Sequence, residues 1–156
     1  MDFEKFDSRA AATRGAKLHI KHPVTGEPVY DDPIENGGTN SRPCNVIVLG
    51  SESHQAQAAL REIQKRRMTA TSGKKKGEEE VRFLTDLQAE LVEAIKPLIL
   101  GFENINRGKS EATLADVDWF LNLQLMNGSE TEISFAEQIS NFARSRANFL
   151  GNAAGA

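Results

Sequence analysis

Two of the three histidines lie close together, at His19 and His22, and this imidazole pair is the first candidate for chemistry. A zinc ion in a protein needs three or four ligands in tetrahedral geometry, usually supplied by two clustered pairs. The remaining candidates are Cys44 and His54, and neither a C-x-x-C nor an H-E-x-x-H pattern is present. Side chains three positions apart on a strand point to opposite faces, so the pair cannot chelate one ion unless a turn begins between them. We therefore expect no metal site, and we interpret His22, which precedes Pro23, as a turn residue.

Sequence patterns of common catalytic and nucleotide-binding loops are also missing. No G-x-S-x-G nucleophile elbow occurs, and Gly108-Lys109-Ser110 lacks the upstream glycine of a phosphate-binding loop. Asp116 and Asp118 are two residues apart, which places them on different sides of a helix rather than together as an acid–base pair. We therefore expect a protein that is not an enzyme and that holds no cofactor.

Basic residues concentrate between positions 61 and 76, and two interpretations are open for this cluster. One is a patch that grips nucleic-acid phosphates. The other is a solvated helix end followed by a charged linker, because cations near a helix C-terminus complement its dipole. We favour the second, since no aromatic residue is interleaved for base stacking and three glutamates follow at once. The cluster comprises Arg61, Lys65, Arg66, Arg67, Lys74, Lys75 and Lys76.

Length and composition place the chain among ordinary soluble domains. Its 156 residues suffice for one domain with a real hydrophobic core. Hydrophobic residues make up 39% and charged residues 26%, and the net charge of −3 does not favour nucleic acid or anionic membranes as partners. No apolar run is long enough to span a bilayer, no signal-peptide pattern opens the sequence, and the single cysteine suits a reducing compartment. We expect a cytoplasmic protein.

The N-terminal half supplies short β-prone runs around proline and glycine, which is typical of hairpins. We expect a strand at Leu18–Ile20, a hairpin partner at residues 29–30, and a third and most β-like strand within Cys44–Gly50. The intervening residues 31–43 are expected to form a loop.

Helical segments flank this expected sheet. The N-terminal arm carries Phe3 and Phe6, which we expect to dock on the core. Ser51 or Ser53 is a suitable N-cap for a helix that ends near Met68 and covers one face of the sheet.

Apolar residues recur every three or four positions in the second half, which indicates helices. The expected helices span residues 78–95, 113–127 and 134–149. Pro97 should kink or end the first, and a capping box at Thr113 opens the second. The apolar trend of the first helix continues past the proline at Leu98, Phe102 and Ile105.

These elements predict an α+β fold, with a small N-terminal antiparallel hairpin or sheet followed by a mostly α-helical body of about four helices. We divide the chain into an N-terminal sheet region with its covering helix (1–68), a flexible charged linker (69–77), a helical region (78–150) and a disordered tail (151–156), within one compact domain overall.

Most apolar stripes must pack on one another, but some aromatic and apolar side chains near the ends of helices are candidates for binding a partner. These tentative partner-binding residues are Trp119, Phe142, Phe149 and Leu150.

Both ends of the chain resemble those of tail assembly chaperones of long-tailed bacteriophages and prophages. The segments that carry the resemblance are FDSRAAATRGAKLHIKHPVTGEPVY, residues 6–30, and FAEQISNFARSRANFLGN, residues 135–152. Proteins of that family often contain an Ala-rich start, a Gly-Ala-x-Leu-His segment and a Pro-x-Thr-Gly-Glu-Pro turn, and they close with Arg-Ala-Asn-Phe-Leu. The middle of the chain contributes little to the likeness.

The resemblance implies a function by binding. Such chaperones coat the tape measure protein in the host cytoplasm, help to recruit tail-tube subunits and are absent from the finished virion. It also implies self-association, whereas a membrane partner is not expected. Two alternatives remain open: a structural virion component, such as a head–tail connector or tail terminator, and a small nucleic-acid-binding regulator that uses the basic cluster.

The family resemblance further suggests a second, longer product made by a −1 ribosomal slip. Leu150-Gly151-Asn152 can be encoded by CTG-GGA-AAC, which contains a heptamer on which both tRNAs can re-pair. A slip there retains every predicted folded element and replaces only residues 153–156. A simple frayed terminus explains the small-residue tail equally well.

Overall fold

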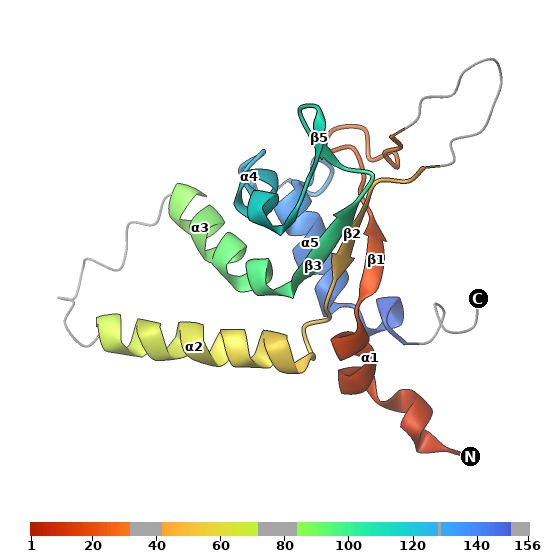
Figure 1. The fold of residues 1–156 in the computed structure, drawn as a ribbon. Coiled ribbons are helices and arrows are strands. Elements are labelled where there is room, and N and C mark those ends of the chain that lie inside the picture. Colours follow the sequence, from red (N-terminus) through yellow and green to blue (C-terminus); the bar gives the residue numbers. More distant parts are fainter. Residues whose placement is uncertain (32–41, 72–83, 128, 151–156) are drawn as a thin grey trace.

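The most β-like segment of the sequence forms the central strand of the fold. The computed structural model describes residues 1–31, 42–71, 84–127 and 129–150. They form an α+β fold with a three-stranded antiparallel sheet in the order β1-β2-β3, which confirms the predicted fold class (Figure 1). The strands of this sheet are β1 (Ala16–His19), β2 (Asn45–Val48) and β3 (Ile99–Glu103), and β4 (Asn106–Arg107) and β5 (Ser110–Glu111) form a separate hairpin.

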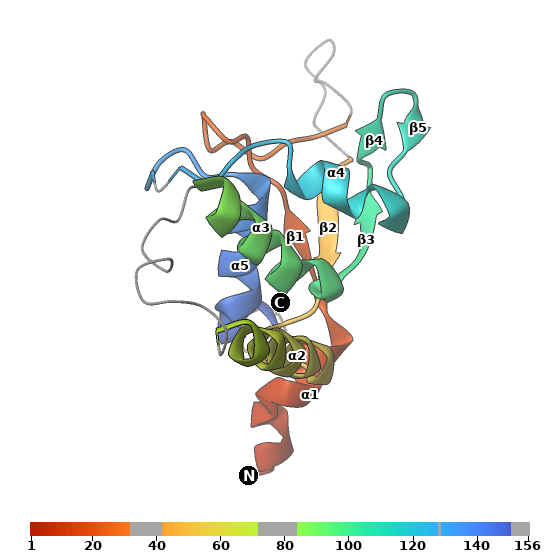
Figure 2. The ribbon, with the colours of Figure 1, turned by 90° about the vertical axis from the view of Figure 1, so that its left-hand side faces the viewer.

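Helices cover one face of the sheet. Figures 1 and 2 show α3 and α5 packed against this face, with α2 running below them. The α-helices are α1 (Ser8–Arg14), α2 (His54–Thr71), α3 (Leu84–Ile95), α4 (Val117–Leu121) and α5 (Phe135–Arg144). Short 3-10 turns are η1 (Phe3–Phe6), η2 (Lys96–Leu98), η3 (Leu114–Asp116) and η4 (Arg146–Asn148).

The core lies between the sheet and the helical layer. Val46 and Val48 of β2 are completely buried, as is Ile139 of α5. Alternation along a strand sends these two valines to the same face, so the branched side chains of β2 pack directly on α5 and its neighbours. The other described members of this core include Ile20, Leu49, Val92, Ile95, Val117, Phe120, Leu121 and Ala136.

The third strand of the sheet comes from the second half of the chain, which corrects the sequence-based interpretation. Pro97 ends α3 at Ile95, and the apolar residues after it form β3 rather than a continued helix. β3 pairs antiparallel with β2 in the register Ile47↔Gly101. The sheet is therefore not confined to residues 1–68, and the apolar spacing after Pro97 had no strand signal clear enough to separate it from a helix.

The expected hairpin between β1 and residues 29–30 does not form as two paired strands. β1 pairs with β2 instead, and Val29 is inserted where these two strands diverge. The N–H of Val29 donates to the Ile20 carbonyl (2.9 Å), and the Val29 carbonyl accepts from the Cys44 N–H (3.0 Å). Val29 thus continues the hydrogen bonding of both strands without belonging to either.

Two predicted capping residues set helix boundaries. Ser53 caps α2 through a bond from the Ala56 N–H to its hydroxyl (3.1 Å). Thr113 and Asp116 form the expected box at the η3–α4 segment. A further capping box, which the sequence analysis did not predict, is formed by Ser134 and Glu137 at α5.

Three helix ends differ from expectation. α4 ends at Leu121 rather than near residue 127, because the side chain of Gln88 on α3 donates to the Leu121 carbonyl (2.9 Å) and turns the chain there. α5 ends at Arg144 rather than Phe149, since Ser145 is extended. α2 continues to Thr71, so the first three residues of the predicted linker are helical.

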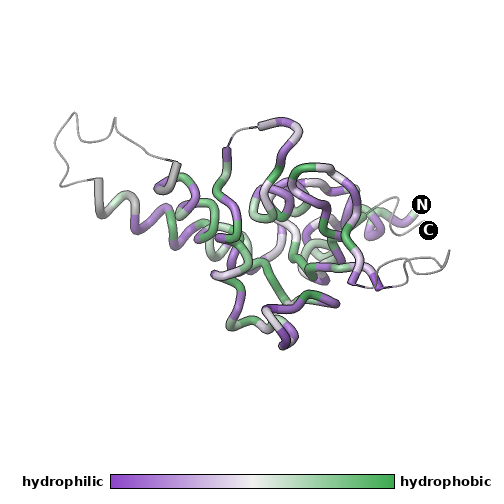
Figure 3. Tube along the Cα trace, turned by 90° about the horizontal axis from the view of Figure 1, so that it is seen from above, coloured by the Kyte–Doolittle hydropathy of each residue, from purple (hydrophilic) through white to green (hydrophobic). Residues whose placement is uncertain are grey.

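Several predictions lie outside the described residues: the rest of the linker, residues 72–77, the first turns of the helix expected from 78, and the tail 151–156. Within the described ranges no helix is long and apolar enough to cross a membrane. Accordingly, Figure 3 shows hydrophilic and hydrophobic segments alternating along the chain.

The N-terminal arm does not dock on the core. Phe3 is 71% exposed and Phe6 is 54% exposed, and their rings contact each other edge to face at 5.4 Å. Asp2 caps this turn and Asp7 caps α1, so the arm is an ordered projection beyond the body of the protein (Figure 1). The expectation that these two phenylalanines enter the core is wrong, because the Ala-rich α1 directs the chain away from it.

Candidate functional site

An apolar groove of about 360 Å³ opens at the end of the molecule that carries α4 and the β4–β5 hairpin. Eight apolar or aromatic residues line it: Ile20, Val29, Tyr30, Ile105, Trp119, Phe120, Leu123 and Phe135. Four polar residues complete the lining: Asp31, Cys44, Asn104 and Asn106. We call this feature the aromatic groove. Its volume lies in the range of ligand-binding clefts, and its walls are mainly apolar.

Phe120 anchors the wall of the aromatic groove. Its ring stacks nearly parallel on Phe135 with 4.9 Å between centroids, and it meets Phe102 of β3 edge to face at 5.1 Å. The Gln124 side chain accepts from the Phe135 N–H (3.1 Å), which holds the chain after α4 against the start of α5. The wall is therefore built from α4, α5 and β3 together, and it is fixed in position by packing.

Trp119 lies half-buried at the groove, beneath the β4–β5 hairpin. The guanidinium of Arg107 on β4 stands 5.2 Å from the centre of the indole ring. Arg107 also donates to Asp116 (3.0 Å), and the Thr113 N–H donates to the same carboxylate (2.9 Å). These two contacts, the Thr113 N–H first, lower the pKa of Asp116. The hairpin is thereby held over the indole by a cation–π contact and a charged hydrogen bond.

A rigid corner forms the floor of the groove. Asn104 has a positive φ of 59°, a backbone conformation that asparagine tolerates better than most residues. Its side chain donates to the Pro43 carbonyl (2.9 Å), and the Cys44 thiol donates to its main-chain carbonyl (3.1 Å). Strands β2 and β3 are thus joined at the point where they leave the sheet, and this joint borders the groove.

Charge is sparse and mostly neutralised at the groove. Asp31 pairs with Arg42 at 2.5 Å on the rim, and Asp116 pairs with Arg107. The groove therefore offers aromatic and aliphatic contact surface to a partner rather than a charged or catalytic centre.

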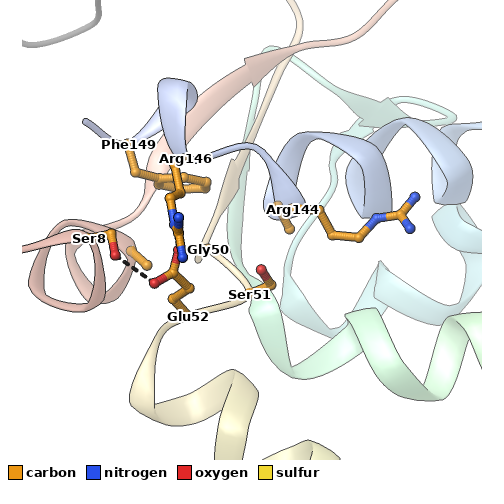
Figure 4. A pocket seen from close by; sticks show the side chains of 9 residues that line it. Ser8, Gly50, Ser51, Glu52, Arg144, Arg146 and Phe149 are labelled. Carbon is orange, nitrogen blue, oxygen red and sulfur yellow. Dashed lines mark hydrogen bonds and ion pairs between the residues drawn. The ribbon is translucent and has the colours of Figure 1, made fainter. Parts of the chain in front are cut away.

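The other predicted partner-binding residues lie at a different place, which we call the C-terminal corner (Figure 4). Phe142 of α5 contacts Phe149 edge to face at 5.5 Å, and Phe149 also approaches Gly50. A β-carbon added at Gly50 would lie 2.6 Å from the Ala12 β-carbon and 3.2 Å from the Phe149 ring. Only about 10 Å³ of space remains between these groups. Phe149 is half-buried in this packing, and the next residue, Leu150, is half-buried as well, with its N–H donating to the Arg146 carbonyl (2.8 Å).

A carboxylate ties three segments together at the C-terminal corner. Glu52, just before α2, accepts from the Ser8 hydroxyl of α1 (2.5 Å) and from the Arg146 guanidinium of η4. The hydrogen bond from Ser8 and, second, that from Arg146 lower the pKa of Glu52. The hydrogen bond to Glu52 in turn raises the pKa of Arg146. Figure 4 shows Glu52 between Ser8 and Arg146, with Phe149 beside them. The corner is a joint within the fold.

The structure thus separates the predicted partner-binding residues: Trp119 lines an open groove, whereas Phe142, Phe149 and Leu150 belong to the C-terminal corner. Partner binding by these four residues stays a prediction, and the packing role of Phe149 weighs against its being spare. Tyr30, Leu123 and Phe135 were not predicted as partner-binding residues, although they line the groove. Of these three, only Leu123 could have been recognised from the sequence as a surface apolar residue, because it lies outside any helical apolar stripe.

The histidines have local roles. The His22 ring accepts from the N–H groups of Val24 (3.1 Å) and Thr25 (3.2 Å), which confirms it as a turn residue. His19 packs edge to face on Tyr30, with ring centres 4.8 Å apart. Across the described part of the chain, no group of three His, Cys, Asp or Glu residues is placed to hold a metal ion.

The basic cluster is only partly described. Arg66 pairs with Glu93 of α3, and Arg61 lies with Arg9, Gln57 and Glu52 around a shallow hollow. Lys74, Lys75 and Lys76 lie outside the described residues.

Comparison of the chain with protein-family models, with curated proteins and with solved structures finds no match.

Proposed function

We propose that this chain is a tail assembly chaperone of a long-tailed phage or prophage. In this proposal it works in the host cytoplasm, is not an enzyme, binds the tape measure protein, helps to recruit tail-tube subunits and is absent from the finished virion. The resemblance of residues 6–30 and 135–152 to that family supports this identity. The observation that carries the binding role is the open, aromatic-walled groove with Trp119 at its side.

A tape measure protein is a long helical chain, and its apolar face needs cover until the tail tube encloses it. An amphipathic helix docks by inserting side chains spaced three, four and seven positions apart into an apolar groove. The aromatic groove has fixed walls, so a helix can bind it without ordering the wall side chains first. Its neutralised rim suits a partner recognised mainly through apolar contacts.

Co-expression with a tagged tape measure protein tests this proposal. Leu123 at the groove is 45% exposed and Leu100 on β3, which is not part of the groove lining, is 46% exposed, so the same substitution can be compared at matched exposure. Leu123→Arg is expected to reduce recovery of the chain with the tape measure at least tenfold, because it puts an unpaired charge into the groove. Leu100→Arg is expected to leave recovery unchanged.

Equal recovery of both variants with the tape measure would refute the groove as the binding site. Two further results would favour the alternatives. Presence of the chain in purified virions would favour a connector or terminator subunit. Binding to DNA that weakens steeply with salt and is lost when Arg61 and Lys65 are neutralised would favour a nucleic-acid-binding regulator.

A further inference from the structure

One polar side chain lies inside the core-facing stripe of α3. Gln88 is 2% exposed, and it shares a helix face with the buried Val92 and Ile95, four and seven positions later. An apolar side chain would pack at this position without the cost of removing an amide from water. The hydrogen bonds of Gln88, rather than its packing, therefore explain an amide at this position.

Gln88 bonds the main chain at both ends of one loop. Its side-chain N–H donates to the Leu121 carbonyl (2.9 Å), and its side-chain carbonyl accepts from the Met126 N–H (2.9 Å). One glutamine can make both bonds because its amide carries a donor and an acceptor on the same planar group. We call residues 122–125, which lie between these two main-chain contacts, the leucine loop, and its Leu123 is 45% exposed.

The leucine loop has few other attachments. Among the residues that the structure describes, the main-chain N–H groups of Gln124 and Leu125 have no hydrogen-bond partner. The Gln124 side chain accepts from the Phe135 N–H (3.1 Å), and the Leu123 N–H makes a long bond to the Phe120 carbonyl (3.4 Å). The position of the loop therefore depends mainly on two side-chain amides, one from the loop itself and one from α3.

We propose that Gln88 is a positioning residue for the aromatic groove. Gln88 does not line the groove, whereas Leu123, in the loop that it holds, lines it together with Trp119. Because both ends of the loop are held, Leu123 is in place before a partner arrives, and binding does not have to order the loop. The effect of Gln88 on tape measure binding rests on the proposed function, whereas its effect on the loop does not.

Hydrogen exchange of the full chain tests this clamp without any partner. In wild type the Met126 amide is expected to be protected, because its N–H is bonded to Gln88, whereas the amides of Gln124 and Leu125 exchange freely. Gln88→Met keeps an unbranched side chain of similar length and removes both bonds. It is expected to raise exchange at Met126 about tenfold and to leave the amides of β2 unchanged. A wild-type Met126 amide as labile as its neighbours would overturn the clamp, even if the variant does not fold.

A second glutamine separates positioning from a general loss of stability. Gln57 of α2 is half-buried, and its side-chain amide donates to the Ser51 carbonyl at the same distance of 2.9 Å, beside the C-terminal corner and away from the groove. Gln88→Met is expected to shift the emission of Trp119, the single tryptophan, and to lower recovery with the tape measure about fivefold. Gln57→Met is expected to change neither.

A double variant tests whether Gln88 acts through Leu123. With Leu123→Ala already in place, Gln88→Met is expected to lower recovery no further, because the contact that it positions is gone. Losses that multiply in the double variant, equal losses from Gln57→Met and Gln88→Met, or an unchanged exchange rate at Met126 would each overturn the positioning role. If Leu123→Arg leaves recovery unchanged, the proposed function fails, and the exchange at Met126 and the emission of Trp119 still decide whether Gln88 positions the loop.

Discussion

The aromatic groove and the C-terminal corner are built from the same kinds of residue, but the groove is open and the corner is filled. Both place aromatic side chains beside a short turn and a charged pair: Trp119 with Arg107 and Asp116 at the groove, Phe149 with Arg146 and Glu52 at the corner. At the groove a volume of about 360 Å³ remains open, whereas at the corner about 10 Å³ remains.

The difference arises from the residues opposite the aromatic rings. At the corner, Ala12 and Gly50 are small enough for α1, β2 and η4 to approach closely, and the Phe149 ring fills the joint. At the groove, the hydrogen bonds of Asn104 and Val29 fix the ends of the strands, and the side chains of Trp119 and Leu123 line space that no small residue allows a further segment to fill. An aromatic residue near the end of a helix thus closes a joint where small residues lie opposite it, as Phe149 does, or lines a groove where they do not, as Trp119 does.

The largest expected effect is at Gly50. Gly50→Ala is expected to reduce the free energy of unfolding by about 2 kcal/mol, because the new methyl group would overlap Ala12 and force α1 away. Urea unfolding monitored by circular dichroism measures this change. The matched control is Gly101→Ala, whose β-carbon would meet Ile47 at an ordinary 4.0 Å. A loss at Gly101 as large as that at Gly50 would contradict the close-approach explanation.

Alanine substitutions at Phe149 and Leu123 are expected to affect different properties: the first lowers stability and the second lowers partner binding. Phe149→Ala is expected to cost about 1–2 kcal/mol of stability, less than a fully buried phenylalanine, since the ring is only half-buried. Leu123→Ala is expected to cost under about 0.5 kcal/mol, because the side chain is 45% exposed. Recovery with the tape measure should show the reverse order. If Phe149→Ala lowers recovery more than Leu123→Ala while leaving stability unchanged, the corner is the binding site and our comparison is wrong.

Glu52 makes the stability of the C-terminal corner depend on pH. Its pKa in the folded chain is lowered from the ordinary value of 4.5, so its contribution to stability is present above that pH and is lost as the pH falls through the lowered pKa. The urea midpoint of wild type is expected to fall on going from about pH 7 to about pH 3. Glu52→Gln should reduce this fall by a small amount. An identical fall in both proteins would show that Ser8 and Arg146 do not stabilise the ionised carboxylate.

The smallest expected effect is at Arg107. Arg107→Gln removes the cation–π contact to Trp119 and the solvent-exposed charged bond to Asp116, and it is expected to lower stability only slightly, because water screens that bond. The tryptophan emission is expected to change, since the charge above the indole is lost. An unchanged spectrum would mean that the β4–β5 hairpin does not rest on Trp119 in solution.

The sequence predicted those features of the fold that depend on local chemistry. The predicted caps at Ser53 and Thr113 each follow from a side-chain oxygen that accepts a main-chain N–H, and each is present. The turn role of His22 follows from the restricted residue before proline. The valine-rich β2 follows from β-branched residues in a short apolar run.

Features that depend on contacts between distant segments were missed. β3 was not predicted, because its apolar residues continue the spacing of α3 past Pro97 and only pairing with β2 identifies it as a strand. The ends of α4 and α5 were placed too late, since the Leu121 carbonyl is bonded by Gln88, thirty-three residues earlier, and Asn148 turns back to the Phe142 carbonyl. The aromatic groove could not be predicted, because its lining comes from segments spread between Ile20 and Phe135.

One hydrogen-bonded pair has a consequence for how the protein is made. The side-chain amide of Gln138 on α5 accepts from the Lys21 N–H and donates to the Lys21 carbonyl, both at 2.9 Å, across 117 residues of sequence. During synthesis at roughly 5–20 residues per second, the chain that follows β1 waits about 6–23 s for that amide to be made. β2 lacks its partner β3 for only part of that interval, because β3 ends at Glu103, before α5 is made. The nascent chain therefore displays an incomplete sheet until β3 is made, and the segment after β1 stays without its α5 contact until Gln138 is made, so the early chain is exposed to aggregation during synthesis.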